Sequence, residues 1–256
     1  MTLSDIRDRV LTRIEADPTD AAWQFVGTCA INEGQRIFAF LSLCLENTRE
    51  LILTPGDQAF NILAQWTDWF VPLRVRISND TTAGVTSEFD AMEGNAGQFN
   101  EQAYPGLTVT GTPKLRPQSI YQMAANDPNW LNNSGVPTRY GMAGWDFLHL
   151  DKSPNLAGLK LLITYARCPV PLVKDSDVPE ILEADHEALV SYGIARLRAN
   201  EGGAELENAT ELINGFLDAA AARFEEVKSR SMAQGYDWPT VELNPAVRQN
   251  PQKKKR

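Results

Sequence analysis

The spacing of hydrophobic residues changes twice along the chain, and this change constrains the fold more than any other feature. Near the N-terminus and over the last third, apolar residues recur every three or four positions, as on one face of an amphipathic helix. Between these regions, segments such as Leu73–Ile77 alternate apolar and polar residues, which is the pattern of a strand with one buried face. The order therefore predicts an α+β fold in which a β-rich region is inserted between helices.

Two helices are predicted ahead of the β-rich region. The first begins at a capping box formed by Thr2 and Asp5 and ends before Pro18. Its apolar face is formed by Leu3, Ile6, Val10, Leu11 and Ile14. The second is predicted from about Asn32 to Glu46, with the side chain of Asn32 as its N-cap.

The middle of the chain contains short strand patterns. A hairpin is predicted at the turn Thr54–Asp57, between strands Glu50–Leu53 and Ala59–Leu63. A helix from Asp57 to Phe70 is a competing interpretation, because the apolar residues of this segment also fit a helical period. Further strands are predicted near residues 120–123, 138–142, 146–151 and 159–167, the last two as an antiparallel pair.

The last third of the chain predicts two long helices joined by a glycine turn. The first runs from Pro179 to about Asn200, with Asp177 as its cap, and Gly202-Gly203 ends it. The clearest helical period of the chain follows, at Leu206, Ala209, Ile213, Phe216, Ala220, Phe224 and Val227. Beyond Gly235, three closely spaced prolines prevent a continuing helix, so we expect an extended arm.

These patterns predict a helical bundle built from two N-terminal and two long C-terminal helices. We expect the N-terminal helices in residues 1–48 and an inserted antiparallel β-rich region in residues 49–172. A helical hairpin in residues 173–234 completes the bundle, and residues 235–256 form the extended C-terminal arm.

The net charge of −9 is unevenly distributed. Residues 175–226 hold thirteen acids and three bases, a net charge of −10, whereas residues 227–256 have a net charge of +5. The first 174 residues supply the remaining −4. The acidity therefore coincides with the predicted helical hairpin, and a basic segment follows it.

No motif in the sequence predicts catalysis, a cofactor or a metal. His149 lies between Asp146 and Asp151, and His186 follows Asp185, but no nucleophile or third ligand stands at a recognisable spacing. We therefore expect no catalytic, cofactor-binding or metal site, and no enzymatic activity. No segment approaches the roughly 18 consecutive apolar residues of a membrane span, so no membrane association is expected.

The cysteines and tryptophans are interpreted mainly as core residues. Cys29, Cys44 and Cys168 are odd in number and widely spaced, which indicates a reducing compartment and excludes a zinc knuckle. We expect all three thiols, and most tryptophans, to be buried. Trp238 differs because it lies on the proline-spaced arm, where an apolar residue indicates a docking segment.

Several short motifs occur in a fixed order over residues 1 to about 230. They are Ile31–Phe38, Gly135–Tyr140, Trp145–Leu150, Ser153-Pro154, Leu161–Tyr165, Pro169, Leu172 and Asp175–Pro179. In this order the chain resembles the head–tail adaptor (head-completion or connector) proteins of tailed bacteriophages, and in particular the α-plus-β adaptors of short-tailed phages.

The resemblance implies a structural virion protein and no catalysed reaction. Such adaptors form a ring, commonly twelvefold, below the portal, where they extend the DNA channel and offer a platform for tail attachment. The implied partners are further copies of the chain, the portal protein, tail, nozzle or tail fibre proteins, and packaged DNA that passes without specific binding. The implied location is the neck of the virion, after assembly in the host cytoplasm.

Two groups of residues are candidates for these contacts. An acidic helix face would repel phosphates in a DNA channel, and the candidate residues for it are Glu201, Glu205, Glu207 and Glu211. The arm carries an apolar anchor and a basic end that suit docking onto the portal. Its candidate residues are Tyr236, Trp238, Pro239, Val241, Leu243, Lys253, Lys254, Lys255 and Arg256.

Two other functions are compatible with the sequence. A tail-tube, nozzle or terminator subunit would share the same setting, although the helical hairpin argues against it. A small hydrolase or carbohydrate-binding domain would use Trp130, Trp145 and His149 with Asp146 and Asp151.

Overall fold

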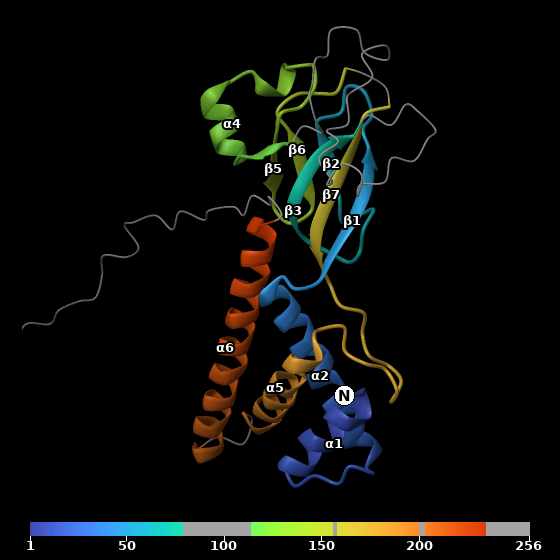
Figure 1. The fold of residues 1–256 in the computed structure, drawn as a ribbon, viewed down its shortest axis with the longest axis vertical. Helices are drawn as coiled ribbons and strands as arrows, with labels where there is room; N and C mark the ends of the chain where they lie inside the picture. Colours follow the sequence, from blue (N-terminus) through green and yellow to red (C-terminus); the bar gives the residue numbers. More distant parts are fainter. Residues whose placement is uncertain (79–113, 156–157, 200–202, 234–256) are drawn as a thin grey trace, which may run out of the picture.

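The protein is elongated, with helices gathered at one end and strands at the other (Figure 1). The computed structural model describes residues 1–78, 114–155, 158–199 and 203–233. Within these residues the chain forms α-helices and sheets whose strands are mostly antiparallel, so the predicted mixture of α and β structure is confirmed. The arm predicted over residues 235–256 lies outside the described residues. None of the described helices is long and apolar enough to cross a bilayer.

The N-terminal helices are α1 (Leu3–Arg13) and α2 (Ala21–Ser42). The capping box of Thr2 and Asp5 is confirmed. The predicted start of the second helix at Asn32 is wrong, because the carboxylate of Asp20 caps α2 by accepting from the Ala22 amide at 2.7 Å. Asn32 instead lies in the middle of α2, and its side chain hydrogen-bonds both the N–H and the C=O of Leu172.

The C-terminal helices are α5 (His186–Arg198) and α6 (Gly203–Ala233), and a 3-10 turn, η2 (Glu183–Asp185), precedes α5. The first of them begins later than predicted. The carboxylate of Asp177 accepts from the amides of Val173 and Lys174, each at 2.8 Å, so Asp177 stabilises a loop and does not cap a helix.

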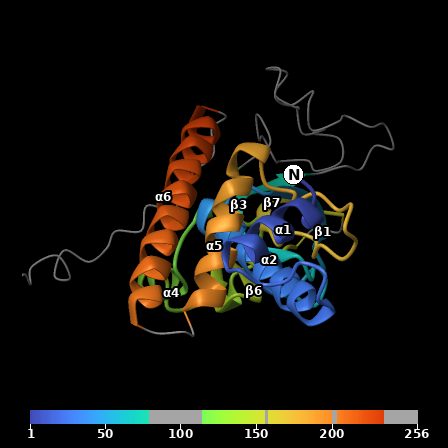
Figure 2. The same cartoon turned by 90° about the horizontal axis from the view of Figure 1, so that it is seen from below.

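The helices α1, α2, α5 and α6 pack together around one apolar core. Seen from below, α6 forms one side of this part and α2 another, with α5 packed against both (Figure 2). Glycines allow close approach at two crossings: a methyl group at Gly34 would lie 2.7 Å from the ring of Tyr192, and one at Gly193 would lie 2.9 Å from Val10. The fully buried side chains of this core include Leu3, Ile6, Val10, Ile31, Phe38 and Leu189.

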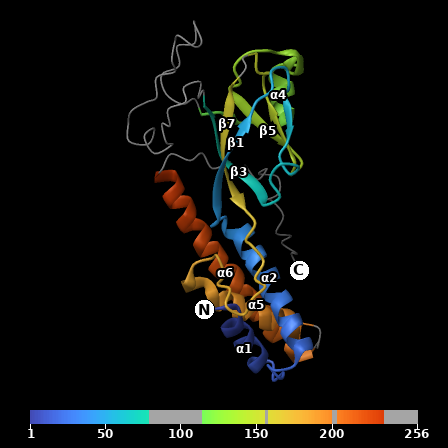
Figure 3. The same ribbon diagram turned by 90° about the vertical axis from the view of Figure 1, so that its right-hand side faces the viewer.

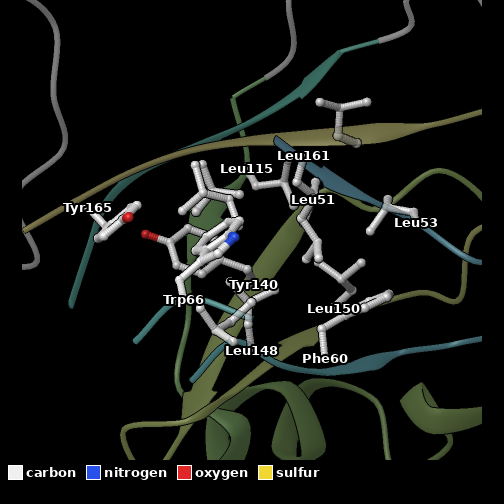
Figure 4. Packing of buried hydrophobic residues seen from close by; sticks show 14 of the residues in the cluster. Leu51, Leu53, Phe60, Trp66, Leu115, Tyr140, Leu148, Leu150, Leu161 and Tyr165 are labelled. Carbon is white, nitrogen blue, oxygen red and sulfur yellow. The ribbon is translucent and has the colours of Figure 1, made fainter. Parts of the chain in front are cut away.

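The strands form two sheets that share a second core (Figure 4). One sheet has the order β1-β7-β3, and the other has the order β2-β6-β5-β4. The strands of the first sheet are β1 (Glu46–Ile52), β7 (Lys160–Arg167) and β3 (Trp69–Ser78). Those of the second are β2 (Ala59–Asn61), β6 (Phe147–Leu150), β5 (Arg139–Ala143) and β4 (Arg116–Pro117). The short helix α4 (Ile120–Asn126) and the 3-10 turn η1 (Trp130–Asn132) follow β4.

Two predicted strand pairings are wrong. The turn at Thr54–Asp57 exists, with an Asp57 N–H to Thr54 C=O bond of 3.1 Å, but β1 and β2 belong to different sheets. Likewise β6 and β7 do not pair with each other. The reason lies in β7, whose side chains are mostly buried, because such a strand takes a central position and pairs with a strand on each edge.

The strand predicted at residues 120–123 is also wrong, because this segment forms α4. Ser119 and Gln122 form a capping box that starts the helix. The strand predicted at residues 138–142 is confirmed as β5.

Candidate interaction surfaces

The predicted acidic residues of the C-terminal hairpin separate into two environments. Glu205 forms an ion pair of 2.8 Å with Arg198 of α5 and is only partly exposed. Glu207 and Glu211 are exposed on α6. Glu201 lies outside the described residues. The structure thus brings two of the four predicted carboxylates to one exposed helix face.

That face, here called the acidic ridge, consists of Glu207, Glu211 and Asp218. The ridge is opposite to the buried face of α6, which contains Phe216 and Ala220. Within the described residues, none of the three ridge carboxylates forms an ion pair, so their negative charge is directed to solvent. Sequence reasoning missed Asp218, although its spacing of seven residues from Glu211 places it on the same face.

The nine arm residues predicted to dock, from Tyr236 to Arg256, lie outside the described residues. Helix α6, which precedes the predicted arm, ends at Ala233, close to the strands (Figures 1 and 3).

A cavity of about 650 Å³ lies where the helical and β parts meet. One wall is α2, with Gln35 and Arg36, and the other is the segment Cys168–Pro171. The Gln35 side chain is 1 % exposed; its Nε2 donates to the Val170 carbonyl at 3.1 Å, and its Oε1 has no hydrogen-bond partner. Arg36 is exposed and has no ion pair within the described residues.

An ion pair holds this segment in place. The guanidinium of Arg167 donates to both carboxylate oxygens of Glu180, at 2.8 and 3.0 Å, and the Val170 amide donates to Glu180 at 2.7 Å. The hydrogen bonds from Arg167 lower the pKa of Glu180 below its ordinary value. The charged carboxylate therefore fixes the connection between β7 and α5.

Aromatic side chains join the two parts of the molecule. The ring of Phe40, on α2, contacts Phe70 of β3 edge-to-face, with centroids 5.3 Å apart, and lies 6.1 Å from the ring of Trp145. The indole N–H of Trp69 donates to the Trp145 carbonyl at 3.0 Å. Trp145 itself is 62 % exposed, so this junction presents an aromatic surface to solvent.

Within the described residues, neither histidine is hydrogen-bonded to the aspartates that lie near it in the sequence. The carboxylate of Asp151 accepts from the amides of Thr138 and Arg139, and burial lowers the pKa of His149. His149 lies edge-on to Trp130, with ring centroids 6.2 Å apart. His186 is buried and contacts the Ile181 carbonyl at 3.2 Å, while Asp185 pairs with Arg223. Among the described residues no three His, Cys, Asp or Glu side chains are grouped to hold a metal.

The expectation that all three cysteines are buried is wrong for Cys29, which is exposed on α2. Cys44 and Cys168 are partly buried, and burial raises the pKa of both thiols. Three of the described tryptophans are buried, Trp66, Trp69 and Trp130, whereas Trp23 and Trp145 are exposed.

Comparison with known protein families identifies the chain. The model of the SU10 adaptor protein family matches residues 1–241, a range that includes the helical part, the β part and the first part of the predicted arm. The chain belongs to the SU10 adaptor protein family. The resemblance to phage head–tail adaptors is therefore confirmed, and the chain is a structural component of a phage particle. No curated protein matches it.

Proposed function

We propose that this adaptor forms a ring of twelve copies below the portal, where it extends the DNA channel and carries the tail. The family match over residues 1–241 is the observation that carries this proposal. The elongated shape supports it, because separate helical and β parts offer two ends that can contact different partners (Figure 3). Its partners are then the portal protein on one side and tail, nozzle or tail fibre proteins on the other.

The acidic ridge carries the negative charge expected of a surface that lines a DNA channel. Glu207 and Glu211 are exposed and unpaired within the described residues, so in a ring they would repeat in every copy and repel the DNA phosphates. Repulsion of this kind lets DNA slide without specific binding. Glu205 contributes less, because Arg198 compensates its charge.

The C-terminal arm is proposed to dock onto the portal. Its apolar residues Tyr236, Trp238, Val241 and Leu243 would serve as an anchor, and the basic run Lys253–Arg256 would meet an acidic surface. Deletion of residues 236–256 should weaken portal binding and leave the helical circular-dichroism signal unchanged. Undiminished portal binding by the truncated chain would contradict the docking role.

The proposed function is tested in the phage itself. A phage that carries a stop codon early in this gene should package DNA into heads that have no tails, because the platform for tail attachment is missing. Complementation with the intact chain should restore infectious particles. Heads that fail to fill with DNA, or complete tails on particles without the protein, would contradict the proposal.

A further inference from the structure

Two unpartnered helix faces lie on different sides of the helical part (Figure 2). On α2, the outer face opposite to the buried residues is formed by Phe25, Val26, Cys29 and Arg36, all exposed. On α6, a flank next to the acidic ridge is formed by Leu206, Thr210, Ile213, Leu217 and Ala221. Each face has the three- and four-residue spacing with which helices pack side by side.

Both faces expose large apolar side chains to solvent. Phe25 is 70 % exposed, and Leu206 and Leu217 are 49 % and 42 % exposed. The α2 outer face carries large side chains, and the α6 flank carries Leu206, Ile213 and Leu217 and ends at the small residue Ala221. Apolar side chains at these spacings on two helices can interdigitate in a side-by-side helix contact.

Charges of opposite sign accompany these faces. Arg36 on α2 and Asp218 on α6 are exposed, and neither has an ion pair within the described residues. The two positions are at nearly the same height, because Phe38 and Phe216 contact each other inside one copy with ring centroids 5.7 Å apart. Arg36 precedes Phe38 by two residues, and Asp218 follows Phe216 by two. Because α2 and α6 run in the same direction (Figure 1), Arg36 and Asp218 differ in height by about 6 Å, a distance that an arginine side chain can span.

We propose that the α6 flank of one copy packs on the α2 outer face of the next, with Asp218 of the first copy paired to Arg36 of the second. The proposal rests on the ring of the proposed function and names its subunit contact. Because the two faces differ and lie on different sides of one copy, the contact is head-to-tail, which is the arrangement that builds a ring when the rotation between copies closes. Glu207 and Glu211 of the acidic ridge stay free to face the channel, whereas Asp218 is used in the contact.

Charge reversal in purified protein, mixed with portal rings of the same phage, tests the contact. Arg36→Glu and Asp218→Arg should each raise the adaptor concentration needed for half-maximal ring assembly at least about tenfold, as expected for a close charge pair across an interface. The double variant should restore assembly to within a few-fold of the unmodified chain. Arg116→Glu, an exposed arginine of β4 in the other part of the molecule, is the matched control and should have no effect.

Cross-linking gives a second readout that does not depend on affinity. Cys29 precedes Phe38 by nine residues and Leu206 precedes Phe216 by ten, so the Phe38–Phe216 contact puts the two at similar heights. A Leu206→Cys chain treated with a short bismaleimide on the portal should therefore form a ladder of covalent oligomers longer than dimers. The same chain with Cys29→Ser should not.

The outcomes distinguish the proposed subunit contact from the proposed ring. Suppose that the unmodified chain and both charge variants assemble rings on the portal equally well, and that no ladder forms. The proposed subunit contact is then wrong, and the ring itself is not contradicted. A ladder that stops at dimers would also overturn the contact, because it indicates a symmetric pair. If the unmodified chain forms no ring with the portal, the proposed function itself is wrong.

Discussion

Arg223 of α6 holds the carboxylate of Asp185 at the end of η2, where its Nε and Nη2 donate to the two oxygens at 2.8 and 3.1 Å. Both side chains are only 11 % exposed. The hydrogen bonds to Asp185 raise the pKa of Arg223, so this guanidinium remains charged. The pair ties the long C-terminal helix to the start of α5.

Removing one partner of this pair should destabilise the helical part. Arg223→Ala leaves a largely buried carboxylate without its cation, and we expect the free energy of unfolding to fall by about 3 kcal/mol. Denaturant unfolding followed by circular dichroism at 222 nm measures the change. Arg9→Ala is the control, because its pair with Glu187 is half-exposed and should cost at most about 1 kcal/mol. Equal effects of the two substitutions would contradict the account.

Glycine substitutions should have opposite effects at two helical positions. At Gly34 an added methyl group meets the ring of Tyr192 at 2.7 Å, so Gly34→Ala should destabilise the protein by about 1–3 kcal/mol despite the better helix propensity of alanine. At Gly215 nothing lies within 4 Å, so Gly215→Ala should stabilise it by about 0.5–1 kcal/mol. Thermal or denaturant unfolding of both variants measures these changes in stability. Stabilisation by Gly34→Ala would show that α2 and α5 do not pack this closely.

The ion pair of Glu180 predicts a pH-dependent stability. The pKa of this carboxyl is lowered in the folded state, so its contribution is complete above the unfolded pKa of about 4.3 and is lost as the pH falls through the lower folded value. Glu180→Gln should therefore cost about 1–2 kcal/mol at pH 7, and the difference from the unmodified chain should shrink below about pH 4. Unfolding curves measured from pH 3 to pH 7 test this. A difference that is independent of pH would mean that the charge is not the cause.

The three thiols should react at different rates. Cys29 is exposed, whereas burial raises the pKa of Cys44 and Cys168 and so reduces their thiolate fraction. With a thiol reagent such as Ellman's, we expect one fast thiol in each folded chain at pH 8, and Cys29→Ser should abolish the fast phase. If all three thiols reacted at the same rate, the result would contradict the described environments of the cysteines.

The elements that were predicted correctly depend on local sequence. The helix α1 follows from a capping box and an apolar face that lie within a dozen residues, and the face of α6 follows from its regular period. The acidic ridge could be found in the same way, because a helical period that buries Phe216 also places Glu207 and Glu211 on the opposite face.

The elements that were predicted wrongly depend on distant residues. Strand β1 pairs with β7, so that Glu46 lies opposite Ala166, and no local turn signal indicates such a partner. Asn32 has the composition of a helix cap, but its amide hydrogen-bonds Leu172, 140 residues away. The cavity beside Gln35 was missed for the same reason, because its two walls come from segments far apart in the chain.

The central claim is that this adaptor assembles as a ring on the portal, and cryo-electron microscopy of the purified portal mixed with the adaptor tests it most directly. We expect a second ring of density below the portal, with one adaptor for each portal subunit, in which the helices α2 and α6 of neighbouring copies lie side by side. A portal whose lower face remains bare at saturating adaptor, while the adaptor stays monomeric in solution, would contradict it.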